Sequence, residues 1–137
     1  MENIKFYYGL ENVDFKKLTA MLASSYWTPG INEEYLRRAA ANSAVVVSVY
    51  DGTEQIGFCR AVSDKTRFAY IMDVYIDAPY RRHGIGQRML RFLLDSSELS
   101  TVYQCFLLTR YAHGFYKKLG FRDFSRPGDI LELPLKR

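Results

Sequence analysis

A turn rich in arginine and glycine, at residues 81–88, is the part of the sequence best suited to bind an anion. Gly84 and Gly86 follow Arg81 and Arg82, and a helical pattern begins at about Ile85. A helix start leaves backbone N–H groups without intrahelical partners and carries the positive end of the helix dipole, so it attracts phosphate. The glycines remove Cβ atoms that would keep a bulky anion away from these amides, and the arginines add positive charge. The turn is therefore predicted to bind a polyphosphate.

Length and composition are those of one ordinary domain, which we expect to span residues 1–137. Cys59 and Cys105 lie far apart in apolar runs, which favours buried, reduced thiols over a disulfide. The net charge of +4 is spread along the chain apart from the turn, so we expect no nucleic-acid partner. The sequence shows no leader-like start and no apolar run of about 20 residues, the length that spans a bilayer. We therefore expect a cytoplasmic protein with no membrane partner.

Hydrophobic periodicity predicts the elements that precede the turn. Apolar residues recur at helical spacing in residues 14–25 and 32–42, while β-branched and aromatic residues gather in short runs typical of strands. These strands are expected at 4–8, 44–50, 55–62 and 70–76. Residues 51–54 would join the second and third as an antiparallel hairpin, and the last three strands would form a meander.

The helix after the turn and the strand that follows it predict a strand–helix–strand unit. Ile85, Met89 and Leu93 mark the buried face of the helix, and residues 102–109 form the next apolar run. Such a unit makes the strands at 70–76 and 102–109 parallel. A short helix at 112–119 and a final pair of strands at 121–124 and 130–135 complete the prediction. The fold class is α/β (α+β), with a mixed sheet.

Two short signatures narrow the choice of ligand. The turn lacks the Gly-Lys-Ser/Thr ending of a P-loop, and Met89 stands where a dinucleotide-binding fold has its third glycine. Arg81-x-x-Gly84-x-Gly86 and the segment AHGFYKKLGF at residues 112–121 instead match the two signatures of the GCN5-related N-acetyltransferases (GNAT), at the expected separation. The chain therefore resembles this family. The segments SYW at 25–27, GFCR at 57–60, DVYI at 73–76 and TRYAHGFY at 109–116 are similar to one poorly assigned bacterial branch.

The resemblance implies a fold, a cofactor and the residues that hold it. The family fold is a mostly antiparallel central sheet with one splayed parallel strand pair and helices on both faces, and the cofactor is acetyl-CoA as acetyl donor. Backbone amides of residues 82–87 would cradle its pyrophosphate, and the main chain of residues 74–76 would bind its pantetheine arm. The implied cofactor-binding residues are Val74, Tyr75, Ile76, Arg81, Arg82, His83, Gly84, Ile85, Gly86, Gln87, Thr109, Ala112 and Tyr116. Thr109 replaces an Asn found in many members, and Tyr111 replaces the usual Asp of the branch.

Tyr116 and Asp73 are the candidate catalytic residues. Tyr116 matches the position of the family's general acid, and a phenol is protonated at neutral pH and can donate to a leaving thiolate. The alternative for Tyr116 is a ring that packs beneath CoA. Asp73 interrupts an apolar strand, where burial would raise its pKa toward that of a general base, but a structural aspartate with water as the base fits the sequence equally well. Strand alternation places Asp73 on one face with Ile71 and Tyr75, and Met72, Val74 and Ile76 on the other.

The acceptor is expected to be a primary amine of a small molecule or peptide. Tyr26, Trp27, Arg60 and Asp64 could line its pocket. Arg60 would suit an amine that carries a carboxylate, and Asp64 a cationic one. The alternatives are a hydrophobic lid formed by the two aromatic residues, and surface positions for the two charged ones.

The remaining expectations concern metal binding, oligomeric state and function. His83 and His113 have no third ligand at a suitable spacing, so no metal site is expected. Monomer and homodimer are both compatible with the sequence. The function predicted from the resemblance is acetyl-CoA-dependent N-acetyl transfer by direct reaction in a ternary complex. A non-catalytic acyl-CoA-binding sensor or regulatory module is the alternative.

Overall fold

A single mixed sheet forms the centre of the protein in the computed structural model, which describes residues 3–136. Five strands lie in the order of the sequence: β1 (Ile4–Tyr8), β2 (Val45–Asp51), β3 (Glu54–Ser63), β4 (Ala69–Ile76) and β5 (Cys105–Phe106). The first four are antiparallel neighbours, and β5 pairs with β4 in parallel. This arrangement confirms the predicted mixed sheet, the meander and the parallel strand pair.

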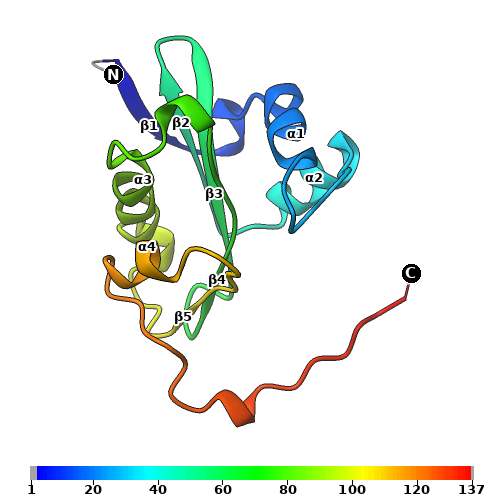
Figure 1. Ribbon diagram of the computed structural model, residues 1–137, viewed down its shortest axis with the longest axis vertical. Coiled ribbons are helices and arrows are strands. Elements are labelled where there is room, and N and C mark those ends of the chain that lie inside the picture. Colours follow the sequence, from blue (N-terminus) through cyan, green and yellow to red (C-terminus); the bar gives the residue numbers. More distant parts are fainter. Residues whose placement is uncertain (1–2, 137) are drawn as a thin grey trace.

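Two pairs of helices cover the two faces of this sheet (Figure 1). One face carries α1 (Phe15–Ala23) and α2 (Glu33–Ala41), and the other carries α3 (Ile85–Leu94) and the short α4 (His113–Lys117). Side chains of Asp14 and Asn32 accept hydrogen bonds from the first turns of α1 and α2, as expected for helix caps. Separate apolar clusters fill the two layers, so the predicted helices on both faces are confirmed.

The fourth strand contains a β-bulge at Asp73, which has a φ of 56°. The pairing of β4 with β3 shifts register here, so that β4 carries one more residue than its partner. Beyond the bulge the alternation of side chains is reversed: Ile71 and Val74 pack in the same apolar cluster, whereas Tyr75 packs against the other. The prediction that Ile71 and Tyr75 share a face is therefore wrong, because simple alternation has no place for the extra residue.

The C-terminal strands are a second difference from the sequence prediction. The strand predicted at 102–109 is reduced to β5, and residues 121–124 and 130–135 do not form the predicted strand pair. Residues 127–129 form a single 3₁₀ turn, after which the chain runs away from the sheet (orange to red in Figure 1). A strand forms only where a neighbour supplies its ladder of hydrogen bonds, and the described part of the chain supplies none to residues 130–136.

Candidate active site

The glycine turn, residues 81–87, follows β4 and includes the start of α3. Arg82 and Gly84 have φ angles of 66° and 79°, both in the left-handed region, and Gly84 is the residue that precedes α3. No side chain of the described residues caps this helix, so its first amides are available to a ligand. Alternating backbone conformations of this kind form a concave group of N–H donors that binds anions. The local geometry therefore fits the predicted pyrophosphate cradle.

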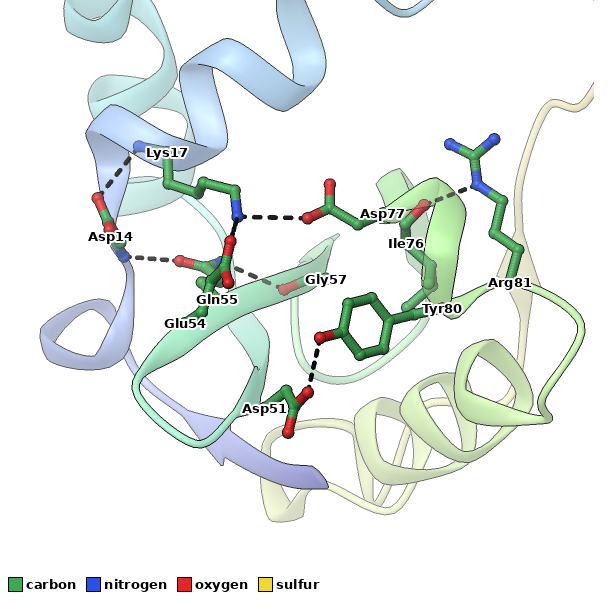
Figure 2. A network of polar contacts seen from close by, with 10 residues as sticks. All are labelled: Asp14, Lys17, Asp51, Glu54, Gln55, Gly57, Ile76, Asp77, Tyr80 and Arg81. Carbon is green, nitrogen blue, oxygen red and sulfur yellow. Dashed lines mark hydrogen bonds and ion pairs between the residues drawn. The ribbon is translucent and has the colours of Figure 1, made fainter. Parts of the chain in front are cut away.

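A polar network fixes the segment between β4 and the glycine turn (Figure 2). Lys17 Nζ of α1 lies 3.3 Å from Asp77 Oδ2, and Tyr80 donates a hydrogen bond of 2.6 Å to Asp51 of the β2–β3 hairpin. Arg81 Nε donates to the carbonyl oxygen of Ile76 at 2.7 Å, which holds this side chain over the end of β4. The turn is thus tied to α1, to the hairpin and to β4, so its backbone conformation is set before a ligand arrives.

The two glycines of the turn serve different purposes. A Cβ atom on Gly84 would meet nothing within 4 Å, whereas one on Gly86 would lie 3.0 Å from the ring of Phe115 in α4. Gly84 is therefore required by its positive φ and leaves open space for an anion. Gly86 instead allows α3 and α4 to approach, which brings the two sequence signatures into contact. The expectation that Gly86 also clears space for an anion stays a prediction.

Asp73 lies in a buried polar cluster at the β4 bulge. Its Oδ2 accepts a hydrogen bond from Arg60 Nε at 2.7 Å, and its Oδ1 accepts one from the Trp27 indole N–H at 3.2 Å. Arg60 also donates to the hydroxyl of Ser43 at 3.2 Å. The Arg60 guanidinium and the Trp27 indole together give this buried carboxylate one cationic partner and two hydrogen bonds. These contacts agree with the structural alternative for Asp73, and its use as a general base stays a prediction.

A cavity of about 330 Å³ lies beside this cluster, and we call it the aromatic cavity. Three separate segments line it: the loop at 26–27, β4 from 70 to 74, and residues 107–116. The cavity brings together Tyr26, Trp27, Asp73 and Tyr116, which were predicted to carry catalysis or acceptor binding, and three predicted cofactor-binding residues, Val74, Thr109 and Ala112. The bulged strand and the start of α4 thus enclose the same space.

Tyr116 places a phenol at the wall of the aromatic cavity. The residue is only 9% exposed, and its ring packs edge-on against Phe115 and Phe121. Burial raises the pKa of Tyr116, with smaller contributions from Cys59 and Tyr26. Its hydroxyl makes no hydrogen bond among the described residues, and the residue lines the aromatic cavity. A protonated hydroxyl free to donate is the chemical state that a general acid requires.

The family model for the acetyltransferase (GNAT) domain matches residues 42–123, which include the bulge, the glycine turn and α4. The chain belongs to this family. An uncharacterized N-acetyltransferase of Pyropia yezoensis, ycf52, is 28% identical to the chain over 122 residues, which cover 81% of the chain and 66% of that relative. A second curated relative, from Gibberella zeae, is covered over 41% of its length. The chain thus spans less than two thirds of the length of either relative.

Solved structures of GNAT-like proteins share this fold. A protein of Xanthomonas campestris pv. campestris assigned to the GNAT family superposes with a TM-score of 0.90 at 22% identity, covering 96% of this chain and 93% of that one. A protein of Clostridium acetobutylicum solved with acetyl-CoA has a TM-score of 0.72 at 19% identity, covering 96% of each chain. GNAT proteins use acetyl-CoA as acetyl donor, which agrees with a polyphosphate ligand at the glycine turn.

Two residues proposed to contact the GNAT acceptor lie outside the aromatic cavity. Asp64 is exposed in the β3–β4 turn, where its carboxylate accepts hydrogen bonds from three backbone N–H groups. These hydrogen bonds lower the pKa of Asp64. Arg60 lies behind Asp73 rather than in the cavity wall, since its guanidinium is buried against that carboxylate. Their charges were visible in the sequence, but the side of the sheet on which each would lie was not.

Thr109 contributes to the site through the backbone of α4. Its hydroxyl accepts a hydrogen bond of 3.1 Å from the N–H of Ala112, directly before the helix. The side chain that replaces the family's usual Asn therefore orients the start of the helix that carries Tyr116. A contact between Thr109 and CoA stays a prediction.

Sequence reasoning missed several residues that line the aromatic cavity. Tyr70 and Met72 precede the bulge on β4, and Tyr111 packs its ring against Tyr26 with 5.1 Å between centroids. Tyr26 also accepts a hydrogen bond of 3.0 Å from the N–H of Arg110. Five consecutive residues of β4, 70–74, line the cavity, and simple alternation does not predict this because the bulge at Asp73 interrupts it. The contact of Tyr26 with Tyr111 joins segments 85 residues apart and had no local signal.

No helix among residues 3–136 has the length and apolar character needed to cross a membrane. Within the same residues, no group of three or more potential metal ligands is found.

Proposed function

We propose that this chain is an acetyl-CoA-dependent N-acetyltransferase that acetylates a primary amine of a small molecule or peptide by direct transfer in a ternary complex. The observation that carries the proposal is the position of Tyr116, which is buried and lines the aromatic cavity together with Asp73 at the β4 bulge. The glycine turn at the end of the same strand offers the anion site that the cofactor needs.

The glycine turn fits the acidic part of acetyl-CoA. Open space at Gly84, uncapped amides at the start of α3 and the guanidinium groups of Arg81 and Arg82 suit a pyrophosphate. The main chain of residues 74–76 would hold the pantetheine arm, because β5 pairs only with Ala69 and Tyr70 and leaves the later part of this edge of β4 without a strand partner among the described residues. Acetyl-CoA supplies an activated acyl group as a thioester.

The chain's own residues would then position and protonate the reactants. The backbone N–H of Val74 would donate to the carbonyl oxygen that becomes negative during attack. Tyr116 would donate its proton to the departing thiolate, for which its raised pKa keeps it in the protonated form. The amine must lose a proton before it attacks, and this proton would leave through water or to Asp73. Holding the amine and thioester together provides much of the rate.

The aromatic cavity favours an amine that arrives as an ammonium ion. Trp27 and Tyr70 line the cavity, and aromatic faces attract cations, whereas the rings of Tyr26 and Tyr111 already contact the Arg110 guanidinium at 4.8 and 5.9 Å from their centroids. Asp73 adds negative charge, although Arg60 balances it. The cavity volume of about 330 Å³ suits a small acceptor or one side chain of a peptide. The single-domain organisation and cytoplasmic location stay predictions from the sequence.

Two measurements, made one after the other, test the proposed function. Acetyl-CoA at about 100 times its dissociation constant should stabilise the folded chain by roughly 2.7 kcal/mol, measurable as a thermal shift. Thiol release should then be followed with acetyl-CoA and a panel of amino acids, polyamines, aminoglycosides and peptides. Absence of binding would refute the cofactor site. Binding without thiol release from any acceptor class would favour the sensor alternative.

A further inference from the structure

The end of β4 has one edge without a strand partner among the described residues. β5 pairs with β4 only at Ala69 and Tyr70, so the residues beyond the bulge face no strand on that side. On the other side, the N–H of Asp77 donates to the carbonyl oxygen of Ile56 at 2.8 Å. Hydrogen-bonded pairs alternate along an antiparallel ladder, so the N–H and the carbonyl of Ile76, one residue earlier, point to the free edge.

The side chain of Arg81 occupies this carbonyl oxygen. Its Nε donates a hydrogen bond of 2.7 Å to the oxygen of Ile76 (Figure 2). The centre of its guanidinium lies 5.3 Å from the centre of the Tyr75 ring. No ion pair joins Arg81 to a carboxylate of residues 3–136. The guanidinium, whose fork of donors matches a carboxylate or a phosphate, is therefore held by one neutral oxygen and one aromatic face.

The position of Arg81 conflicts with a ligand that lies along the same edge. The amide N–H groups of a pantetheine arm need acceptors on the main chain of residues 74–76, and the Ile76 carbonyl is the last of these. A guanidinium that donates to this oxygen and lies against the Tyr75 ring takes the space beside it. An arm on this edge must therefore displace Arg81 before it can bind the Ile76 carbonyl.

Phosphate groups at the glycine turn can remove Arg81 from this carbonyl. Arg81 is the first residue of the turn and its side chain is exposed, so rotation about its own bonds moves the guanidinium from β4 toward an anion at residues 82–87. Hydrogen bonds from Arg to phosphate are roughly twice as strong as those to a neutral oxygen, and they are often bidentate. A pyrophosphate therefore offers Arg81 a better partner than Ile76 does, whereas a ligand without phosphate offers no replacement.

We propose that Arg81 determines donor specificity, because it covers the Ile76 carbonyl against thioesters that lack phosphate and releases it to thioesters that carry a pyrophosphate. The inference rests on the proposed function, since it takes the free edge of β4 as the place of the pantetheine arm. S-acetylpantetheine has the arm and the thioester of acetyl-CoA but no phosphate, so it must displace Arg81 without compensation. Acetyl-CoA gives Arg81 a phosphate contact in exchange for the carbonyl contact.

Binding of the two donors to Arg81→Ala tests this inference without an acceptor amine. Dissociation constants are measured by calorimetry for acetyl-CoA and by NMR titration for S-acetylpantetheine. Removal of the side chain should tighten binding of S-acetylpantetheine by about two- to tenfold, the factor for one ordinary hydrogen bond. It should weaken binding of acetyl-CoA by about tenfold or more, the factor for a hydrogen bond to a charged group. Unchanged or weaker binding of S-acetylpantetheine would overturn the inference, because a residue that only binds phosphate gives that result.

The matched control is Arg82→Asn. Arg82 carries the same charge in the same turn, but the hydrogen bond to Ile76 comes from Arg81. Asn tolerates the φ of 66° at this position, because its short polar side chain adopts the left-handed region more readily than most. Arg82→Asn should weaken binding of acetyl-CoA and leave that of S-acetylpantetheine unchanged. Equal tightening of S-acetylpantetheine by both substitutions would assign the effect to lost charge and would count against the Arg81 contact. Thermal unfolding checks that both variants are folded.

Inorganic pyrophosphate provides a second test, on the wild-type chain. Bound at the glycine turn, it should draw Arg81 from the carbonyl and tighten binding of S-acetylpantetheine by about two- to tenfold, relative to sodium chloride of equal ionic strength. The effect should be absent in Arg81→Ala. If acetyl-CoA binds the wild type but pyrophosphate tightens S-acetylpantetheine in neither protein, or equally in both, the role of Arg81 is refuted and the cofactor site stands. If acetyl-CoA does not bind the wild type, the proposed function and this inference are refuted together.

Discussion

The glycine turn presents mainly backbone to its ligand, whereas the aromatic cavity is formed by side chains from three separate segments. The turn occupies seven consecutive residues, and its conformation depends on two left-handed positions and a network that holds its base. The aromatic cavity combines the loop at 26–27, β4 and residues 107–116, and the bulge at Asp73 sets their relative positions. The shape of a backbone site depends little on its side chains, whereas the shape of a side-chain site changes with each substitution.

Loss of the Tyr116 hydroxyl should have the largest effect and should separate the two regions. Tyr116→Phe should reduce thiol release by about 10²–10⁴-fold, the range for removal of a general acid, because only the donor is lost while the ring packing stays. Acetyl-CoA affinity, measured by calorimetry, should be nearly unchanged since the glycine turn is intact. Tyr111→Phe, at an exposed position in the same cavity, is the matched control and should change turnover by a few-fold at most. Full activity of Tyr116→Phe would favour the role of an aromatic ring packing beneath CoA.

Removal of the Asp73 carboxylate should weaken the fold and the acceptor site together. Asp73→Ala leaves Arg60 buried without its partner, a change that typically costs about 3–5 kcal/mol of unfolding free energy, and it frees the Trp27 indole. Denaturant unfolding should show the loss of stability, and KM for the amine should rise while acetyl-CoA affinity changes little. Asp64→Ala, which removes an exposed carboxylate from a turn, should destabilise the protein far less. If Asp73→Ala and Asp64→Ala lowered the unfolding free energy equally, the buried Arg60–Asp73 pair would contribute no more to stability than an exposed carboxylate does.

The contact between the two sequence signatures, residues 81–86 and 112–121, can be tested at Gly86. Gly86→Ala puts a Cβ atom 3.0 Å from the Phe115 ring, and overpacking of this kind should cost about 1–3 kcal/mol of stability. Phe115→Leu should recover part of that loss, which a double-mutant cycle by thermal unfolding would reveal as a coupling energy. Gly84→Ala should show no such coupling, because its Cβ would meet open space. Additive effects at Gly86 and Phe115 would disprove the packing role.

The regular elements could be predicted from the sequence because their patterns are local. Periodicity located β1 to β4, the first three helices and the parallel connection, and the arrangement of Arg81, Gly84 and Gly86 predicted an anion site at a turn whose helix start is uncapped in the structure. The bulge at Asp73 was not predictable, since an extra strand residue leaves no mark on the apolar pattern. The pairing of Arg60 with Asp73 depends on the register of two strands, and the contact of Tyr26 with Tyr111 depends on the whole fold. The C-terminal strand prediction failed for a third reason, because a strand needs a partner that the described chain does not provide.

Alkaline pH should have the smallest effect on the unfolding free energy. The size of this effect reports how far the Tyr116 hydroxyl is shielded from water. Burial raises the pKa of Tyr116 above its ordinary value of 10.0, so the folded protein retains a proton that the unfolded chain releases. The stability from this group is complete below pH 10.0 and is lost as the pH rises toward the folded-state pKa. Between pH 10 and 11 the wild type should therefore lose unfolding free energy more steeply than Tyr116→Phe, by up to about 1.4 kcal/mol per pH unit. The other tyrosines are common to both proteins, so their titration cancels in the comparison. Parallel slopes would mean that water reaches the phenol freely, and the aromatic cavity would then be as open to solvent as the glycine turn.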